Sequence, residues 1–308
     1  MARKRDNGPG GLIVVDKPAG FTSHDVVAKL RGMARTRRVG HAGTLDPMAT
    51  GVLVVGTERS TRLLGHLALT EKEYVATVRL GQETVTEDAE GEITAAKGAK
   101  DLDRARVEAA VAGLTGEIEQ VPSSVSAVKV DGKRAYARIR DGEQVELAAR
   151  PVTVSSFVVH DVREETAEDG TPVTDLLVSV VCSSGTYVRA LARDLGAALD
   201  TGGHLTALRR TRVGPYRLEG AHTLEQLQGR VDAGEPLPVL PLGEAAAAAF
   251  ERWDVDEEDA RRIGNGVQLR MPAGRKGDGP VAVFGPGDRF VALVAESGGR
   301  AKSLAVFV

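Results

Sequence analysis

Residues 40–53 read Gly-His-Ala-Gly-Thr-Leu-Asp-Pro-Met-Ala-Thr-Gly-Val-Leu, and this stretch is the most informative part of the chain. It holds one carboxylate, Asp46, and the Pro47 that follows biases the Asp46 backbone away from the helical region. Because glycines and a proline interrupt regular structure, we expect residues 40–51 to form a shaped loop that enters a strand. A single acid in such a loop can present a nucleophile or a base to an anionic substrate. An Asx turn, in which Asp46 caps its own loop, explains the same pattern.

The segments before this loop predict a strand and a helix. Residues 11–15 form a short apolar run that is typical of a buried strand. Residues 22–25, Thr-Ser-His-Asp, have the form of a capping box and predict the start of a helix. The apolar residues at 26, 27, 30 and 33 fall on one face of that helix. The helix leads into a basic loop at residues 35–38.

The rest of the chain predicts interleaved strands and helices without a regular strand–helix–strand rhythm. Helices are predicted at 103–114 and 187–199, and strands at 72–80, 125–130, 152–160 and 173–182. Turn dipeptides such as Asp131-Gly132 are typical of hairpins. We therefore predict an α+β fold with a mixed, largely antiparallel central sheet and flanking helices.

The composition changes near residue 231, which suggests how the chain is divided into domains. Residues 231–246 are rich in Pro, Gly and Ala and are typical of a linker. After them, a short helix and three short strands predict a small β domain. We therefore expect three parts: a disordered tail at 1–10, a main domain at 11–245 and a small C-terminal β domain at 246–308.

The overall composition is that of an ordinary folded protein. The chain has 308 residues, of which 42% are hydrophobic and 27% charged. The single cysteine, Cys182, excludes an internal disulfide framework and a zinc site built from cysteines. No apolar run approaches the roughly 18 residues of a membrane span, and no apolar segment follows the basic N-terminus as in a signal peptide. We therefore expect a cytoplasmic protein.

The charge distribution differs from what the net charge suggests. The net charge of −3 alone argues against a nucleic-acid partner. However, residues 1–70 hold 11 Lys or Arg and 5 Asp or Glu, and residues 208–217 hold four arginines and no acid. Because local basic faces attract a polyanion, these two regions are candidate contact surfaces for one.

Six segments, in matching order over roughly residues 10–225, resemble motifs of the TruB family, the bacterial tRNA pseudouridine synthases that act on uridine 55 of the T loop. Residues 40–53 resemble the catalytic motif of this family. The other five segments are 16–23, 72–74, 122–136, 182–196 and 204–211. An ordered set of motifs is far more specific than any one of them. The chain departs from the family at Ser123-Ser124, where a second proline is common, and this leaves the shape of that segment open.

This resemblance implies a fold and a reaction. The fold would be that of the pseudouridine synthases, with a PUA-like C-terminal domain at residues 246–308. The chain would isomerise uridine 55 of tRNA to pseudouridine. The reaction breaks the C1′–N1 glycosidic bond, rotates the uracil and joins C5 to C1′.

Three residues match catalytic positions of the family. Asp46 matches the catalytic aspartate, whose carboxylate attacks the sugar or the base, or assists a glycal route. Arg189 matches the arginine that pairs with this aspartate and holds it ionised and fixed. Tyr187 matches an active-site tyrosine, which is a candidate general acid or base. Without the resemblance, Arg189 would be interpreted as a helix-surface arginine and Tyr187 as a core residue.

Other residues match positions that bind the substrate. Tyr74 matches the tyrosine that stacks on the flipped base, since an aromatic face offsets part of the free energy of flipping. His41 matches a histidine at the entrance, and Leu208 matches an apolar residue of the uracil pocket. Without the resemblance, all three would be interpreted as structural residues. Three basic residues contact either phosphate or the protein itself: Lys17, Arg209 and Arg210.

The sequence contains no signal for a cofactor. It has no dinucleotide fingerprint, no Gly-Lys-Ser/Thr of a P-loop and no His/Cys cluster, so we expect no cofactor and no metal. We expect tRNA, through its T arm, as the partner, with no required protein partner, no membrane and a monomeric chain. A non-catalytic RNA-binding module is one alternative. A carboxylate hydrolase is another, although glycoside hydrolysis usually needs two facing acids.

Overall fold

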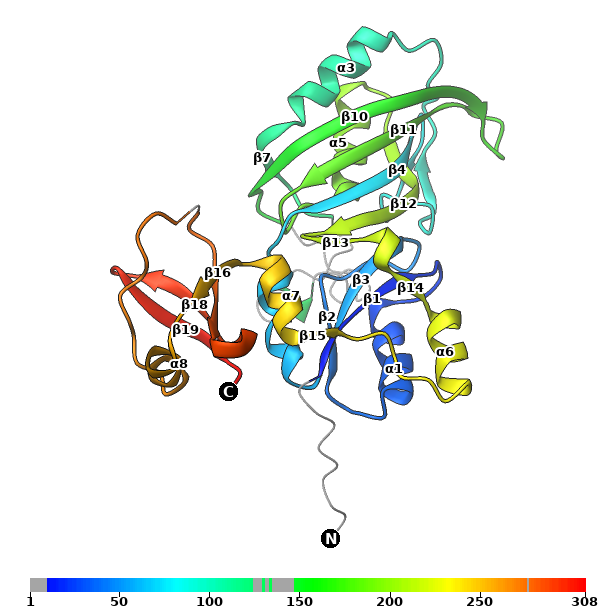
Figure 1. The fold of residues 1–308 in the computed structure, drawn as a ribbon. Coiled ribbons are helices and arrows are strands. Elements are labelled where there is room, and N and C mark those ends of the chain that lie inside the picture. The colour runs from blue at the N-terminus through cyan, green and yellow to red at the C-terminus, as the bar shows by residue number, and fades with distance from the viewer. Residues whose placement is uncertain (1–9, 124–128, 131–132, 135–146, 276) are drawn as a thin grey trace. The chain divides into compact units, whose positions relative to one another are not determined.

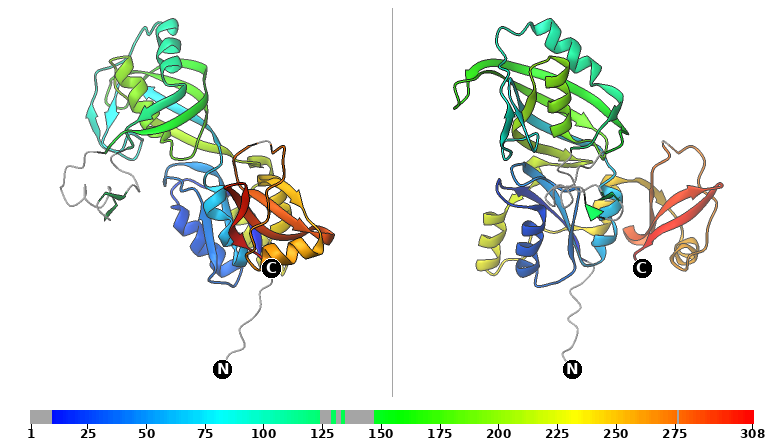
Figure 2. Two further views of the ribbon diagram at one scale, coloured as in Figure 1. Left: turned by 90° about the vertical axis from the view of Figure 1, so that its left-hand side faces the viewer. Right: turned by 180° about the vertical axis from the view of Figure 1, so that it is seen from behind.

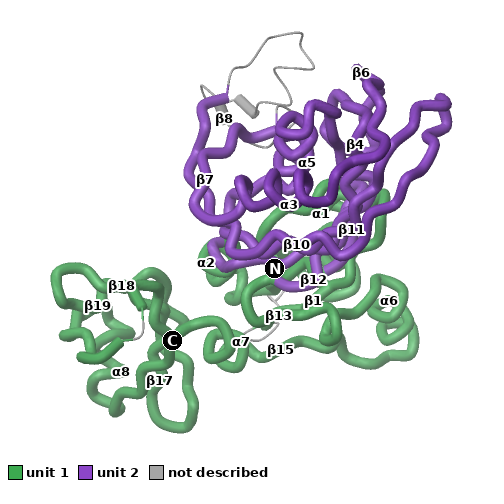
Figure 3. The backbone as a smooth tube through the Cα atoms, turned by 90° about the horizontal axis from the view of Figure 1, so that it is seen from above, with its two compact units in different colours: residues 1–46, 52–68, 213–308 green, residues 47–51, 69–212 purple. Residues whose placement is uncertain are grey.

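The computed structural model describes residues 10–123, 129–130, 133–134, 147–275 and 277–308 (Figure 1). The expected tail at 1–10 lies outside these residues except for Gly10, as does most of the motif at 122–136 with its predicted strand and turn. The chain divides into two compact units, which Figure 3 distinguishes by colour. Unit 1 comprises residues 1–46, 52–68 and 213–308, and unit 2 comprises residues 47–51 and 69–212.

Unit 1 contains a small sheet in the order β14–β1–β3. Strand β2 pairs antiparallel with β3, β15 pairs antiparallel with β1, and β14 runs parallel to β1. The strands are β1 (Gly11–Lys17), β2 (Val39–Ala42), β3 (Thr50–Thr57), β13 (Tyr216–Arg217), β14 (His222–Thr223) and β15 (Leu240–Pro241). The helices are α1 (Ser23–Met33), η1 (Glu58–Arg62), α2 (Leu64–Leu67), η2 (Leu218–Gly220), α6 (Leu224–Asp232) and α7 (Leu242–Ala249).

Side chains on both faces of this sheet are buried, as the two-residue period of a strand allows. Ile13 and Val15 of β1 pack with residues of α1 and α6 in one buried cluster. These two helices lie side by side in Figure 1. Leu12 of β1 faces the other way and packs with residues of α2 and α7 in a second cluster. The continuous apolar run of residues 52–55 in β3 supplies both clusters.

The C-terminal part of unit 1 is a four-stranded sheet in the order β16–β17–β18–β19. Its elements are β16 (Glu251–Asp254), α8 (Glu257–Gly264), β17 (Val281–Gly285), η3 (Pro286–Asp288), β18 (Arg289–Ser297) and β19 (Arg300–Val306). Phe284, Phe290 and Phe307 belong to the same buried cluster as Leu12 and Val54. The C-terminal sheet and the N-terminal sheet of unit 1 therefore share a hydrophobic core.

Unit 2 is built on a sheet in the order β12–β4–β11–β10–β7. Its strands are β4 (Lys72–Leu80), β7 (Gly116–Gln120), β10 (Arg150–Thr166), β11 (Pro172–Cys182) and β12 (Gly203–Val213). Alternate residues of β4 are buried, from Lys72 to Leu80. Helices α3 (Arg104–Gly113) and α5 (Val188–Ala198) lie on one face of this sheet (Figure 2). Four short strands form two further pairs: β5 (Glu83–Thr84), β6 (Ile93–Ala95), β8 (Lys129–Val130) and β9 (Lys133–Arg134).

Most predicted elements are confirmed. Thr22 and Asp25 form the expected capping box at the start of α1, and Asp103 caps α3. Strand pairing is mixed and largely antiparallel, with parallel pairs at β1–β14, β3–β12 and β16–β17. No helix in the described part of the chain is both long and apolar enough to cross a membrane.

Two predictions of irregular structure are wrong. Residues 40–42 belong to β2, because Gly40 and His41 pair with Gly56 and Val55 of β3. The irregular loop is therefore confined to residues 43–49.

The segment 231–246 is not a linker, since it contains the end of α6, all of β15 and the start of α7. Leu242, Ala245 and Ala246 at its C-terminal end are buried in the core of unit 1. The expected boundary between residues 245 and 246 falls within α7. The division into a main domain and a PUA-like domain stays a prediction.

Candidate active site

The loop of residues 43–49 carries Asp46, whose side chain is half-buried. The residue before it, Leu45, is held by Ser23, the first residue of α1. The Leu45 N–H donates to the Ser23 Oγ over 2.9 Å, and the same Oγ donates to the Leu45 carbonyl over 3.2 Å. Both residues are buried, at 4% and 1% exposure. The backbone next to Asp46 is therefore tied to the N-terminus of α1.

His41 lies on β2, two residues before the loop begins, and is half-buried. Its ring stands edge-on to the ring of His24, with the centroids 5.5 Å apart and the planes at 82°. His24 is exposed in the first turn of α1. The start of α1 thus contacts this predicted site residue as well as the loop.

Lys17 ends β1 and is fully buried. Its ammonium group donates to the carbonyls of Pro18 over 2.9 Å and Phe21 over 2.6 Å. These bonds close the turn that leads into α1. Of the two roles expected for Lys17, the geometry favours the structural one.

The C-terminal end of the loop belongs to unit 2, where it joins β12. Thr50 and Gly51 pair in parallel with Arg209 and Arg210. Gly51 has φ +99°, and a Cβ at this position would lie 2.1 Å from the Arg210 carbonyl oxygen, so only glycine fits. Arg209 Nη1 donates to Thr50 Oγ1 over 3.2 Å, and Arg210 is 1% exposed. These contacts favour a structural role for both arginines.

Arg189 lies in the first turn of α5 and is 3% exposed. Its Nη1 donates to the Thr86 carbonyl over 2.6 Å and to the Ser123 Oγ over 3.1 Å. Its Nε lies 3.6 Å from Oδ2 of Asp88, and both side chains are 4% exposed. Arg189 is therefore not a helix-surface arginine, and the segment after β5 holds its guanidinium in place.

Arg193, one turn further along α5, binds the same segment. Its Nη1 lies 2.7 Å from Glu87 Oε1, its Nε donates to Asp194 over 2.8 Å, and its Nη2 donates to the Val121 carbonyl over 2.8 Å. Burial alone would lower the pKa of Arg193, but the carboxylates of Glu87 and Asp194 raise it above its ordinary value. Arg189 and Arg193 together fix residues 86–88 against α5.

The burial of this acidic segment was not predicted from the sequence. Glu87 and Asp88 are buried at 8% and 3% exposure, although both lie in a strongly acidic stretch that is typical of a solvated surface. The spacing Thr84-x-Thr86-x-Asp88 was the available signal, because short polar side chains at alternate positions often bond to one another. The structure shows one such bond, from Thr86 Oγ1 to Asp88 Oδ1 over 2.5 Å, and Thr84 Oγ1 donates to the backbone carbonyl of Asp88 over 2.8 Å.

Tyr187 is the N-cap residue of α5 and is half-buried. Its N–H donates to Gln120 Oε1 over 2.8 Å, and Gln120 Nε2 donates to the Tyr187 carbonyl over 3.1 Å. Gln120 ends β7 and is 2% exposed. This reciprocal pair fixes the backbone of Tyr187, and no local pattern in the sequence predicts it.

Tyr74 and Leu208 lie on the neighbouring strands β4 and β12 of unit 2. Both side chains are 7% exposed. Tyr74 falls in the buried set of alternate β4 residues, on the same face as Lys72 and Ala76. The structure thus places these two predicted substrate-binding residues in one layer of unit 2.

Beside Tyr74, the buried face of the sheet carries an amine and a thiol. Lys72 pairs with Cys182 across β4 and β11, and its Nζ donates to the Thr70 carbonyl over 2.6 Å. Burial, together with the charge of Arg210, lowers the pKa of Lys72 to about 8. Burial raises the pKa of the Cys182 thiol to about 11. Because these two pKa values differ from the ordinary ones, we expect the stability of unit 2 to depend on pH above neutrality.

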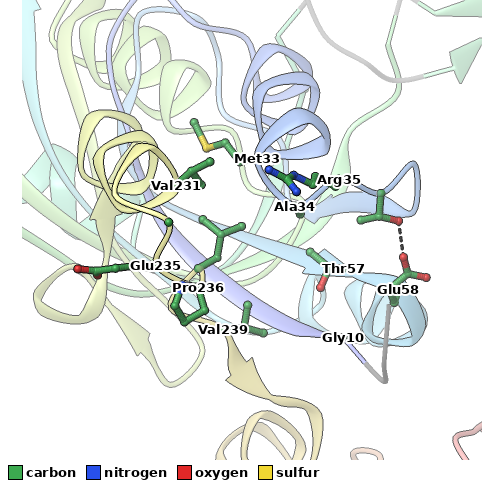
Figure 4. Close-up of a pocket in the computed structure, with 13 residues that line it drawn as sticks. Gly10, Met33, Ala34, Arg35, Thr57, Glu58, Val231, Glu235, Pro236 and Val239 are labelled. Carbon is green, nitrogen blue, oxygen red and sulfur yellow. Dashed lines mark hydrogen bonds between the residues drawn. The ribbon is translucent and has the colours of Figure 1, made fainter. Parts of the chain in front are cut away.

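Unit 1 also has a groove of about 710 Å³ that is separate from the residues considered above (Figure 4). Apolar side chains of Met33, Val231 and Val239 line it, together with Arg35 and Glu58. None of the predicted site residues lines this groove. Within the described ranges, no group of three or more His, Cys, Asp or Glu side chains is placed to hold a metal ion.

Comparison with solved structures identifies the fold. The chain matches one in a crystal structure of a Cbf5–Nop10–Gar1 complex with a TM-score of 0.73 and 27% identity, over 97% of this chain and 85% of that one. It also matches a chain of an H/ACA RNP bound to a substrate RNA containing 2′-deoxyuridine, with a TM-score of 0.71 and 25% identity over 98% and 86% of the two chains. The α+β fold is therefore that of the pseudouridine synthases, with a C-terminal β domain.

Comparison of sequences identifies the family. Residues 31–188 match the TruB family pseudouridylate synthase N-terminal domain, residues 189–236 the tRNA pseudouridylate synthase B C-terminal domain, and residues 250–308 the tRNA pseudouridine synthase II C-terminal domain. Two similar proteins are named tRNA pseudouridine synthase B. One, from Streptomyces griseus, is 69% identical over 97% of both chains, and the other, from Streptomyces avermitilis, is 67% identical over the same shares. The chain belongs to the TruB family, which confirms the resemblance seen in its motifs.

Proposed function

We propose that this chain is a tRNA pseudouridine synthase that converts uridine 55 of the T loop to pseudouridine. The reaction breaks the C1′–N1 bond, turns the uracil and forms a C1′–C5 bond, while C5 loses a proton and N1 gains one. The observation that carries the proposal is the loop of residues 43–49 in a chain of the TruB family, with Asp46 as its single carboxylate.

Asp46 supplies the carboxylate that attacks the sugar or the base, or that assists a glycal route. Tyr187 moves a proton near the ribose or C5, and its backbone is fixed by Gln120 for this purpose. Arg189 presents a buried positive charge that Asp88, Thr86 and Ser123 hold in one orientation. Asp46 belongs to unit 1 and Arg189 to unit 2, and their pairing stays a prediction.

Unit 1 offers a surface for the RNA backbone. Five basic side chains in α1 and the loop after it are exposed: Lys29, Arg31, Arg35, Arg37 and Arg38. The nearby Asp25 carboxylate accepts hydrogen bonds from the Thr22 N–H and hydroxyl, so it is engaged in the capping box of α1. A group of cations of this kind positions RNA through its phosphates, and it makes the affinity depend on salt.

The test is conversion of an unmodified tRNA transcript by the pure chain, with pseudouridine mapped at single-nucleotide resolution. We expect one site, at position 55, and no conversion in a matched transcript that carries cytidine there. Because only the pure chain is present, turnover also establishes that no protein partner is required. Binding of tRNA without any conversion would contradict the proposal and favour a non-catalytic RNA-binding module.

A further inference from the structure

The hydroxyl of Ser23 is not used to begin the helix in which it lies. The first N–H groups of a helix need an acceptor, which the N-cap side chain normally supplies. In α1, Thr22 has this role, with its Oγ1 accepting from the Asp25 N–H over 3.1 Å. The Asp25 carboxylate accepts from the Thr22 N–H over 2.9 Å and completes the capping box. Ser23, one residue later, directs its hydroxyl to Leu45 instead.

The contact with Leu45 restrains the backbone of Asp46. The Leu45 carbonyl and the Asp46 nitrogen belong to one planar peptide group, so a bond to that carbonyl limits the orientation of the whole plane. Ser23 also binds the Leu45 N–H, which fixes the other end of the residue. On the far side of Asp46, Pro47 restricts its backbone dihedral angles. The half-buried side chain of Asp46 therefore projects from a backbone that is restrained on both sides.

We propose that Ser23 is a positioning residue, whose hydroxyl places the Asp46 carboxylate for the reaction through the backbone of Leu45. The inference rests on the function proposed for Asp46. A reacting group that is misplaced by about 1 Å can slow a reaction by about 10²-fold, even when the substrate still binds. Loss of the Ser23 hydroxyl therefore lowers the rate of the chemical step, beyond any effect that it has on the stability of the fold.

Ser60 provides a matched control in the same unit. It is fully buried, and its hydroxyl also bonds to backbone, with its one proton within reach of the Gly11 carbonyl at 2.9 Å and the Thr57 carbonyl at 2.5 Å. Its two partners lie in β1 and β3 rather than in the loop of residues 43–49. Ser23→Ala and Ser60→Ala thus remove the same group from similar surroundings, and only the first alters the support of Asp46.

The experiment compares these variants by single-turnover conversion of a tRNA transcript, by tRNA affinity and by thermal midpoint. We expect Ser23→Ala to lower the single-turnover rate constant about 10- to 100-fold, with the dissociation constant for tRNA within about twofold of the unmodified chain. Ser60→Ala should convert tRNA at the normal rate, even if its thermal midpoint falls by the same amount. Ser23→Thr keeps the hydroxyl and should restore the rate to within about threefold.

Equal rates for Ser23→Ala and Ser60→Ala would overturn the proposal and leave Ser23 with a structural role only. If Ser23→Ala does not fold, the same comparison is made between Ser23→Cys and Ser60→Cys, because a thiol is a weak donor of similar size. Failure of the proposed function gives a different result. In that case the unmodified chain itself converts no uridine. If only the role of Asp46 fails, Asp46→Asn still converts uridine, whatever the rates of the serine variants.

Discussion

Asp46 in unit 1 and Arg189 in unit 2 are held by different kinds of interaction. In unit 1, a neutral group fixes the segment that leads to Asp46, because the Ser23 hydroxyl bonds to both the N–H and the carbonyl of Leu45. In unit 2, a buried ion pair with Asp88 holds Arg189, and the half-buried Arg193 pairs with Glu87, the residue next to Asp88.

This difference predicts how much a substitution in each unit lowers the free energy of unfolding. Loss of one neutral hydrogen bond leaves a buried polar group unsatisfied, at a free energy of about 1–3 kcal/mol. Loss of one partner of a buried ion pair leaves an uncompensated charge, at about 3–5 kcal/mol. We therefore expect substitutions in the loop of residues 43–49 to act mainly on the rate of the chemical step. Substitutions in the charged cluster of unit 2, which comprises Glu87, Asp88, Arg189 and Arg193, should act strongly on stability.

The largest expected effect is that of Asp46→Asn. Asparagine keeps the shape of the side chain but removes its charge and nucleophilicity, so we expect the single-turnover rate of pseudouridine formation to fall by about 10⁴-fold or more. Affinity for tRNA, measured by filter binding, should survive, because binding depends mainly on phosphate contacts. A variant that retains more than about one per cent of the normal rate would show that Asp46 is not the nucleophile.

Next in size is the effect of Asp88→Ala on the stability of unit 2. The substitution removes the Asp88 carboxylate from beside the buried Arg189 guanidinium, so we expect the free energy of unfolding in urea to fall by about 3–5 kcal/mol. The matched control is Glu108→Ala, which breaks the exposed Arg104–Glu108 pair of α3 and should lower stability by less than about 1 kcal/mol. Similar small losses of unfolding free energy in both variants would show that the buried Arg189–Asp88 pair contributes no more to stability than an exposed ion pair.

The local parts of this structure could be predicted from the sequence. The alternation of residues 72–80 gave β4 with its bounds, and Thr22 with Asp25 gave the capping box of α1. The motif at 40–53 gave the family and the candidate site residues, a resemblance that the family comparison confirms. Each of these signals is contained in a few consecutive residues.

What could not be predicted depends on partners far apart in the chain. Gly40 looks like a loop residue, but it lies in a strand because Gly56 pairs with it. The sequence around Asp88 is typical of an exposed acidic surface, but Asp88 is buried because it pairs with Arg189, about a hundred residues later. The position of Ser23 is typical of a residue that caps a helix, but its hydroxyl bonds to Leu45, which is far from it in the sequence. Distant contacts of this kind leave no periodic pattern in the sequence.

A smaller effect is expected at Tyr74, whose ring is proposed to stack on the flipped uracil. Tyr74→Phe keeps the aromatic face and should change the single-turnover rate by less than about tenfold. Tyr74→Leu loses that face and should weaken the interaction with the flipped base by about 1–3 kcal/mol, measured from kcat/KM. Equal kcat/KM values for the two variants, with a lower thermal midpoint for Tyr74→Leu, would show that Tyr74 serves only the core of unit 2.

The smallest effect is a pH dependence of stability that arises from the buried face of unit 2. The pKa of Lys72 is about 8 in the folded chain against 10.5 ordinarily, so between these values the unfolded chain binds more protons and stability rises with pH. We expect the free energy of unfolding in urea to rise by about 1 kcal/mol from pH 8 to pH 9. Lys72→Met has no amine to titrate and should show no rise in this interval.

The pKa of Cys182 shifts in the opposite direction, and this shift limits the pH range over which stability rises. Its pKa is about 11 in the folded chain against 9.0 ordinarily, so above pH 9 the folded chain binds more protons and stability falls with pH. The two contributions offset each other from pH 9 to pH 10, and we expect a plateau there in the unmodified chain. Cys182→Ala should remove the plateau and let the rise continue to pH 10. A rise from pH 8 to pH 9 that persists in Lys72→Met would assign the pH dependence of stability to groups other than Lys72 and Cys182.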